Sequence, residues 1–341
     1  MDDLVYFYPE GHEAHFERGH PERPERVEAI RSALQAAGWW DPYPRLEPVS
    51  LAPDVLKTVH NPAYVSLLEA VCRMDGHLDS DTYTTPDSWR LAHQAAGGAA
   101  AVASQVWQGK ARRGFALCRP PGHHATPGQG MGFCLLNNIA LAAEHLVQAE
   151  TARKLAIVDL DLHHGNGTQD VFWNRGDVLF ISTHQSPLYP GTGHLEETGE
   201  GPGLGTTANL PLPPGSGDAA FQAAMNEVIL PLLDRFDPQM LLVSVGFDTH
   251  WLDPLGHLQL SSGVFMQLVA SLASWADQHC QGRIALVLEG GYDLDAASAC
   301  GLASVAALIG LPWQDPLGPS PVAEGSAWKN TIRRAKEIWG L

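Results

Sequence analysis

The sequence has few cysteines and no spacing that would pair them. Only five of its 341 residues are cysteine, and they lie far apart without a CxxC motif. This argues against a disulfide scaffold and a cysteine-type zinc site, and it indicates a reducing compartment. The first residues, MDDLVYFYPE, lack the basic and apolar segments of a signal peptide. We therefore expect a cytoplasmic protein.

Long apolar runs and basic clusters are also missing. No segment approaches 18 consecutive apolar residues, which argues against a membrane-spanning helix. The net charge is −17, and no cluster of Lys and Arg is longer than two residues. We therefore expect neither a nucleic-acid nor a membrane partner. The acidic balance suits a small cationic substrate or a basic peptide.

Short apolar, β-branched runs alternate with longer segments of helical periodicity. The runs are continuous rather than alternating, as in a parallel sheet covered on both faces. Strands separated by helices indicate βαβ units. The predicted strands are residues 4–8, 114–118, 155–161, 178–184, 240–247 and 284–289. The predicted helices are residues 24–37, 62–73, 87–108, 137–149, 218–235, 261–279 and 293–309.

No composition break divides the chain, and 45% of its residues are hydrophobic. We expect a single α/β domain over residues 1–341, with a mostly parallel central sheet flanked by helices. Residues 185–217 are crowded with glycine and proline and are predicted to form one long loop. A loop of this length in a compact domain is commonly functional.

The stretch IVDLDLHHGNGT places polar residues at the end of an apolar strand. Buried carboxylates are costly unless they are paired or bind a metal. Side chains alternate along a strand, so Asp159, Asp161 and His163 are predicted to share one face. Asp161 and His163 form a pair of metal-type ligands where the strand leaves the sheet.

Two other predicted strands end in the same way. The run MLLVSVGFD ends at Asp248, and the run RIALVLEGGY presents Glu289 and then Tyr292. The carboxyl ends of parallel strands are where open α/β sheets bind ligands. Asp161, His163 and Asp248 would leave a fourth position open, as in catalytic zinc sites. The oxygen-rich ligand set also suits ferrous iron or cobalt.

The segment CRPPGHHATPGQGMGFCLLNN follows another predicted strand. It presents the adjacent residues His123 and His124 on a loop stiffened by proline and glycine. Such a pair suggests a general base and its partner. Asp159, which is not needed as a ligand, could orient one imidazole and set its tautomer.

Six motifs in chain order resemble the histone deacetylase family: PPGHHA, GFCLLNN, DLDLHHGNGT, LYPGTG, GFDTHWLDPLG and LEGGYD. GHPERPERV and VHNPAYV extend the resemblance over nearly the whole chain, and HHGNGT and DPLG are closer to class II than to class I. The resemblance includes bacterial deacetylase-like amidohydrolases and acetylpolyamine amidohydrolases. It implies the arginase–deacetylase fold with long catalytic loops. It also implies a zinc-dependent amidohydrolase that removes acetyl or other short acyl groups from lysine side chains.

The resemblance implies a role for each matching residue. The three candidate ligands match the zinc ligands of the family. His124 matches the general acid/base, and His123 matches its neighbour, which the family pairs with the aspartate found here as Asp159. Tyr292 matches the tyrosine that donates to the substrate carbonyl. Asn166 stands where class I has an aspartate, and an amide stabilises imidazolium less, so the pKa of His124 is left open.

The substrate tunnel is also implied by the resemblance. Gly132 and Phe133 match one wall, and Tyr189 falls where the family places the opposite aromatic wall. Leu255, in DPLG, stands where acetylpolyamine enzymes often have a glutamate at the tunnel mouth. We therefore expect an acyl-lysine peptide or protein as substrate, with an acetylated polyamine as the alternative.

A structural potassium ion is implied as well. Backbone carbonyls around Asp159, Asp161 and His163, with the Ser182 hydroxyl, match the family's potassium site. Arg26 lies where the family has an arginine near an internal channel. The acyl chain preferred and the oligomeric state are left open, and a homo-oligomer is compatible with the sequence.

The chemistry of these residue types agrees with the resemblance. A bound metal would lower the pKa of water toward 7 and polarise an amide carbonyl. His124 would then accept a proton, and the Tyr292 hydroxyl would stabilise the oxyanion. Two remote alternatives are a binuclear manganese ureohydrolase and an inactive module that binds acyl-lysine. The first needs a D-x-D pattern where this chain has Asp248-Thr249-His250, and the second would be expected to lose a ligand or the tyrosine.

Overall fold

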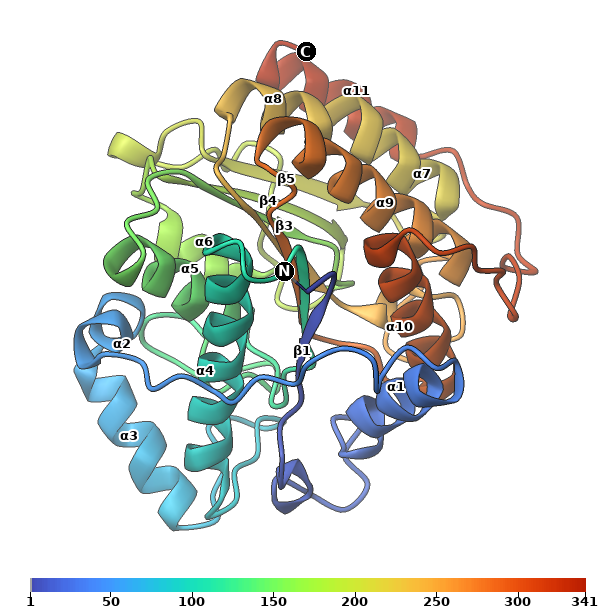
Figure 1. Cartoon of the computed structure of the whole chain (residues 1–341). Helices are drawn as coiled ribbons and strands as arrows, with labels where there is room; N and C mark the ends of the chain where they lie inside the picture. Colours follow the sequence, from blue (N-terminus) through green and yellow to red (C-terminus); the bar gives the residue numbers. More distant parts are fainter. Residues whose placement is uncertain (1) are drawn as a thin grey trace.

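A computed structural model describes residues 2–341 and shows one seven-stranded sheet with every neighbouring pair of strands parallel (Figure 1). The strand order is β1-β2-β7-β6-β3-β4-β5. The predicted α/β class with a parallel sheet is confirmed. The strands are β1 (Val5–Phe7), β2 (Arg113–Ala116), β3 (Leu155–Asp159), β4 (Val178–Gln185), β5 (Thr207–Leu212), β6 (Leu241–Val245) and β7 (Ile284–Leu288).

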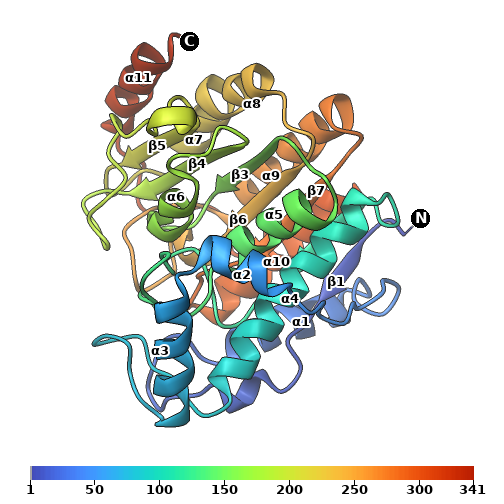
Figure 2. The ribbon, with the colours of Figure 1, turned by 90° about the vertical axis from the view of Figure 1, so that its left-hand side faces the viewer.

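Helices cover both faces of the sheet, and each face has its own apolar core (Figures 1 and 2). Burial on both sides explains why the strands are continuous apolar runs. One face carries α2 (Pro53–Val59), α3 (Pro62–Arg73), α4 (Ser88–Trp107), α5 (Asn138–Ala149) and α6 (Asn166–Phe172). The other carries α1 (Glu25–Ala36), α7 (Asp218–Ala224), α8 (Leu230–Phe236), α9 (Ser262–His279), α10 (Leu294–Ile309) and α11 (Trp328–Trp339).

Six of the seven strands overlap predicted strands. The prediction of one uninterrupted loop over residues 185–217 was wrong. Residues Thr207–Leu212 form β5, which pairs with β4 at the edge of the sheet. Pro211 cannot donate to a neighbouring strand, and an edge strand tolerates this. The short strand β5 was therefore not predicted, because the segments on both sides of it are rich in glycine and proline.

The predicted helices are present, with one division and three additions. The predicted helix 218–235 consists of α7, a π-helical turn over Met225–Ile229, and α8. The additional helices are α2, α6 and α11. Helices α2 and α6 are seven residues each, too short to show a clear 3.6-residue period. That the whole of residues 1–341 makes one domain stays a prediction.

The connections between strands diverge in the middle of the sheet. From β3 the chain continues through α6 to β4, whereas from β6 it continues through α9 to β7 on the opposite side. Because β3 and β6 are neighbours, their outgoing loops separate and leave a crevice at their carboxyl ends. The topology therefore places a binding site beside the residues that follow β3 and β6.

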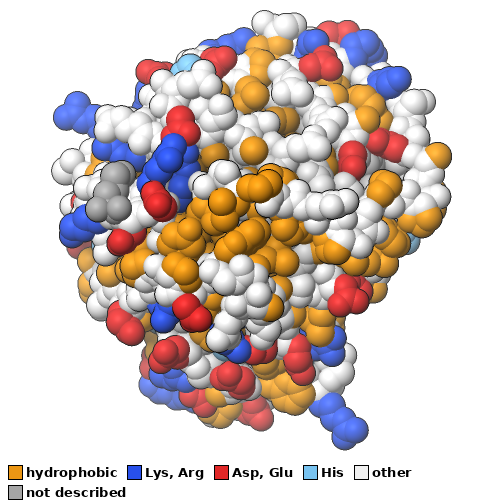
Figure 3. Space-filling model, turned by 45° about the vertical axis from the view of Figure 1, so that its right-hand side comes forward, with side chains coloured by type: hydrophobic (Ala, Val, Ile, Leu, Met, Phe, Trp, Pro, Cys, Tyr) orange, Lys and Arg blue, Asp and Glu red, His pale blue; other side chains and the backbone are white. Residues whose placement is uncertain are grey.

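The surface gives further information about partners. Within residues 2–341, no helix is both long enough and apolar enough to cross a bilayer. On the face seen in Figure 3, basic and acidic side chains are interspersed around a central group of hydrophobic ones. This face does not present charge of a single sign.

A buried ion cluster attaches the N-terminal segment to the sheet. Glu22 is fully buried, and its Oε1 accepts hydrogen bonds from Arg26 at 3.0 Å and from Arg119 at 2.8 Å. Its Oε2 accepts from Arg119 at 3.0 Å and from the Tyr83 hydroxyl at 3.2 Å. Burial alone would raise the pKa of Glu22, but Arg119 and Arg26 outweigh it and lower that pKa to about 2. The charged carboxylate is therefore part of the folded state.

Replacing Glu22 with glutamine should destabilise the fold by about 3–5 kcal/mol, because two buried guanidinium groups lose their counter-charge. A lowered pKa means that this stability is complete above pH 4.5, the ordinary value, and is lost as pH falls toward 2. Urea unfolding at several pH values measures both effects. The control is Glu25→Gln, at an exposed position in α1, which should change stability by no more than about 0.5 kcal/mol. Equal stability of both variants at pH 7 would contradict the argument.

Candidate active site

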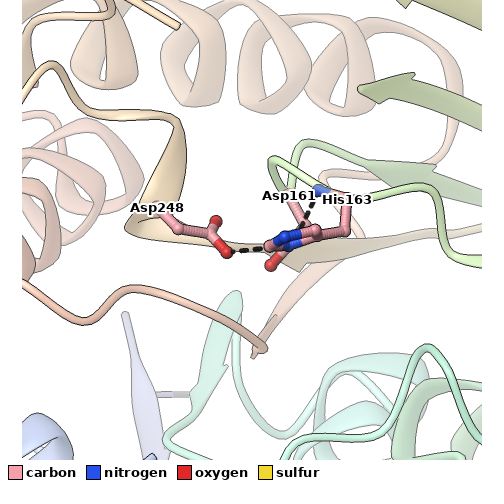
Figure 4. A group of neighbouring side chains, drawn as sticks. All are labelled: Asp161, His163 and Asp248. Carbon is pink, nitrogen blue, oxygen red and sulfur yellow. Dashed lines mark hydrogen bonds and ion pairs between the residues drawn. The ribbon is translucent and has the colours of Figure 1, made fainter. Parts of the chain in front are cut away.

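Three predicted metal ligands meet at the carboxyl edge of the sheet (Figure 4). His163 Nδ1 lies 3.3 Å from Asp161 Oδ1 and 3.3 Å from Asp248 Oδ2. The expectation that Asp161 and His163 share a strand face was wrong in its geometry, because β3 ends at Asp159 and both residues lie in the loop that follows. The loops after β3 and β6, not strand alternation, bring the ligands together.

The surroundings of these residues fit a divalent cation. Asp248 Oδ1 accepts from the Leu162 N–H, but Asp248 Oδ2 is buried and receives no hydrogen bond from residues 2–341. A buried carboxylate oxygen without a hydrogen bond is costly, and a cation bound between Asp248 Oδ2 and the nearby His163 Nδ1 would satisfy it. A Cβ on Gly290 would lie 2.2 Å from Asp248 Oδ2, and one on Gly246 would lie 1.8 Å from Asp161 Oδ2. The two glycines keep this space free of side-chain atoms.

The charges of the cluster point to the same conclusion. Burial, with Asp161 adding to it, raises the pKa of Asp248 to about 7. Burial lowers the pKa of His163, but Asp161 and Asp248 outweigh it and raise that pKa to about 9. A cation would relieve the repulsion between the carboxylates and displace the histidine proton. One nitrogen and two carboxylates suit zinc, ferrous iron or cobalt.

The predicted histidine pair lies beside the ligands, and its two members have opposite environments. The His123 Nδ1–H donates to Asp159 at 2.9 Å, and the His124 Nδ1–H donates to Asn166 Oδ1 at 2.7 Å. Although burial lowers the pKa of His123, Asp161 and Asp159 outweigh it and raise that pKa to about 10. Burial, together with His123, holds the pKa of His124 well below its usual value. His124 is therefore neutral at pH 7, and its Nε2 is available to accept a proton, as a general base requires.

Tyr292 completes the group from the loop after β7. It follows β7 after Glu289 and two glycines, and its backbone N–H donates to Asp253 at 2.6 Å. The guanidinium of Arg26 lies 4.7 Å from the centre of its ring. Burial raises the pKa of Tyr292 well above its usual value, against the effect of Arg26. The hydroxyl therefore keeps its proton at neutral pH and can donate it in a hydrogen bond.

All four predicted tunnel residues border one cavity of about 230 Å³. The lining residues are Asp81, His124, Gly132, Phe133, His163, Leu188, Tyr189, Leu255 and Tyr292. A Cβ on Gly132 would approach His124 to 2.5 Å and Tyr189 to 3.0 Å, so glycine is needed there. The cavity therefore reaches His124, the candidate ligand His163 and Tyr292.

Two lining residues were missed by the sequence analysis. Leu188 precedes Tyr189 in the LYPGTG motif, which could have indicated it. Asp81 comes from LDSDTYT, a segment with no motif, and only the fold brings it to the cavity. Burial, with a hydrogen bond to Asp79, raises the pKa of Asp81.

The predicted potassium site stays a prediction. Ser182 lies beside Asp159 in the pairing of β3 with β4, and its hydroxyl shares a hydrogen bond of 2.9 Å with His184. The carbonyl of Asp159 accepts from Thr183 at 3.2 Å. Arg26, predicted near an internal channel, donates to the carbonyls of Gly291 and Glu289 behind Tyr292.

Comparison with known proteins indicates one family. A family model described as histone deacetylase domain matches residues 20–308. A probable deacetylase of Archaeoglobus fulgidus is 41% identical over 82% of this chain and 78% of its own length. A histone deacetylase-like amidohydrolase of Pseudomonas aeruginosa is 39% identical over 88% of this chain and 80% of its own. The crystal structure of the HDA15 HD domain matches with a TM-score of 0.90 and 34% identity, over 99% of this chain and 95% of that one.

The wild-type chain should bind one zinc-type ion, and His163→Ala should bind it at least about 10²-fold more weakly, because a direct ligand is lost. Elemental analysis and titration calorimetry measure this. The control is His164→Gln, since His164 bonds to Thr192 and Gln169 and is not one of the three ligands. Two equivalents of manganese bound at the site would instead favour the binuclear alternative.

Proposed function

We propose, since this chain belongs to the histone deacetylase family of amidohydrolases, that it is a zinc-dependent deacylase acting on acyl-lysine side chains. The observation that carries the proposal is the 230 Å³ cavity, which His124, His163 and Tyr292 all line. A substrate amide at the end of this cavity would meet a base, a hydrogen-bond donor and a metal ligand together. Acetyl or another short acyl group is the group removed.

The proposed reaction divides the work among the residues at the base of the cavity. A metal held by Asp161, His163 and Asp248 would supply Lewis-acid polarisation and make water more acidic. His124 accepts the water proton at Nε2, because its Nδ1 already donates to Asn166. The Tyr292 hydroxyl donates to the developing oxyanion. Protonation of the amine by a histidine then releases lysine and a carboxylate.

The walls of the cavity support a lysine side chain as the ligand. Phe133 and Tyr189 both line it, and aromatic walls suit the apolar stem of an acylated lysine. Leu255 lines the same cavity. A peptide or protein that carries acyl-lysine is therefore our proposed substrate.

An acetylated polyamine is the second candidate, and Asp81 favours it. Leu255 by itself offers no charge to a second ammonium group. Asp81 lines the same cavity, however, and its carboxyl group could face the distal amine of a polyamine. The two substrates must be separated by experiment.

We also propose a cytoplasmic location and a structural potassium ion near Ser182. The location is supported by the five cysteines, all of which are free thiols. A binuclear ureohydrolase is not favoured, because His250 accepts the Leu252 N–H at its Nδ1 and is absent from the ligand cluster found among residues 2–341.

Replacing Tyr292 with phenylalanine should lower kcat by roughly 10²–10³, because one oxyanion donor is lost. Metal content should be unchanged, since Tyr292 is not among the three candidate ligands. His124→Ala should likewise lower kcat without emptying the metal site. Steady-state kinetics on an acetyl-lysine peptide, with elemental analysis of each variant, measure both changes. Near-normal turnover by the phenylalanine variant would remove Tyr292 from the mechanism.

Replacing Leu255 with glutamate should move the kcat/KM ratio toward N-acetylated polyamines, because a carboxylate is added near the distal amine. A partly exposed ion pair is worth about 0.2–1 kcal/mol, so the change should be several-fold. The control, Leu255→Gln, has similar size without the charge. We expect the wild type to prefer acetyl-lysine peptides over acetylspermidine. The opposite preference would show that Leu255 does not set specificity and would favour Asp81 as the residue that binds the distal amine.

A further inference from the structure

One buried carboxylate beside the proposed active site has no role in the proposed reaction. Glu289 follows β7 directly and is fully buried, yet it is not among the metal ligands and does not line the cavity. A buried carboxylate is costly, so its hydrogen bonds indicate what it does in the fold.

The side chain of Glu289 joins two strands to the histidine loop. Its Oε2 accepts from two consecutive backbone N–H groups, those of Gly122 at 2.7 Å and His123 at 3.0 Å. Its Oε1 accepts from the hydroxyl of Ser244, in β6, at 3.0 Å. Consecutive N–H groups that converge on one oxygen form an anion-binding nest. The loop that carries His123 and His124 is thus held from behind by one side chain.

The backbone of the same residue is tied equally closely to the site. The Glu289 N–H donates to the Val245 carbonyl at 2.9 Å, and its own carbonyl accepts from Arg26 at 2.5 Å. The next N–H, that of Gly290, donates to Asp161 Oδ2 at 2.9 Å. A shift of Glu289 would therefore move the histidine loop relative to a metal ligand.

The loop itself has little freedom to choose another position. A Cβ on Gly122 would lie 2.4 Å from the Asn138 backbone nitrogen, so the chain passes very close to the start of α5. Beyond it, the two imidazoles are held by Asp159 and Asn166. Between Gly122, which is packed against Asn138, and the two imidazoles, the backbone of the loop is held by the hydrogen bonds of Glu289 to the Gly122 and His123 N–H groups.

We propose that Glu289 is a positioning residue that sets the distance between the His123–His124 loop and the metal ligands. This inference rests on the proposed deacylase function and deepens it. Glu289 acts through the Gly122 and His123 amides, without touching substrate or metal. What matters is an acceptor oxygen at the right reach, because catalytic geometry tolerates little error: a misplacement of about 1 Å can cost up to about 10²-fold.

Two substitutions separate reach from charge. Glu289→Gln keeps an oxygen for the two amides, and its NH₂ can donate to the Ser244 hydroxyl, so geometry is kept and charge is removed. Glu289→Asp keeps the charge but withdraws the oxygens by about 1.5 Å, one carbon–carbon bond. We expect kcat of the glutamine variant to stay within about threefold of wild type. We expect the aspartate variant to lose at least about tenfold in kcat, with KM changed less than about twofold.

A second readout does not depend on activity. Hydrogen–deuterium exchange of the metal-free protein should show faster uptake over residues 118–126 in the aspartate variant, and wild-type uptake there in the glutamine variant. A residue that only stabilised the fold would change neither kcat of the folded enzyme nor this segment selectively. The control, Ser244→Ala, removes one donor that is not on the histidine loop, and it should leave uptake over residues 118–126 unchanged.

Each outcome for the Glu289 variants either supports or contradicts the positioning role. Wild-type kcat and exchange in the aspartate variant would overturn it, and so would a tenfold loss in the glutamine variant. If the aspartate variant does not fold, the kcat of the folded glutamine variant still tests the proposal, because a tenfold loss there would overturn it. If the wild type does not hydrolyse acetyl-lysine peptides, the proposed function fails, whereas the exchange comparison still tests the anchoring of the loop.

Discussion

The structure depends on keeping several carboxylates buried at the carboxyl edge of an apolar sheet. Asp159, Asp161, Asp248 and Glu289 are all nearly or fully inaccessible to solvent. Each such group must be compensated where it lies, because desolvating an unpaired carboxylate costs several kcal/mol. Histidine, backbone amides and, for Asp248 Oδ2, a cation are the available partners. The arrangement of the site follows from this requirement.

The same requirement explains why the two histidines differ. Against the effect of burial, Asp161 and Asp159 raise the pKa of His123, whereas burial and the neighbouring His123 lower the pKa of His124, which has only the Asn166 amide as its Nδ1 partner. An amide fixes the orientation of a ring without adding negative charge. The pKa of His124 is low because of burial and the neighbouring His123 and His163, whereas the hydrogen bond to Asn166 acts in the opposite direction and does not outweigh them.

The residues of the candidate site come from segments that meet only in the folded chain. The loop with His123 and His124 follows β2, the candidate metal ligands follow β3 and β6, and Tyr292 follows β7. Because β6, between β7 and β3, borders the point where the connections diverge, all four segments reach one crevice. Glu22 forms hydrogen bonds with Arg26 and Arg119 and so attaches the N-terminal segment to the loop after β2. Arg26 also contacts the ring of Tyr292.

The sequence alone determined the parallel α/β class, most of the strands and helices, and the residues at the strand ends. It could do so because these features are local: a continuous apolar run shows a strand covered on both faces, and a polar residue at its end stands out. The segment that became β5 was not recognised, because an edge strand of six residues between glycine- and proline-rich flanks has little pattern of its own.

Only the tertiary structure decided which residues meet. The carboxylate of Glu289 and the amide of Gly122 lie 167 positions apart in sequence, and no local pattern links them. Asp81 and Leu188 join the same cavity from different loops, and Asp161 and His163 converge through a loop rather than along a strand. The physical reason is that periodicity records which face of an element is buried, whereas contacts between loops depend on how the strands are ordered in the sheet.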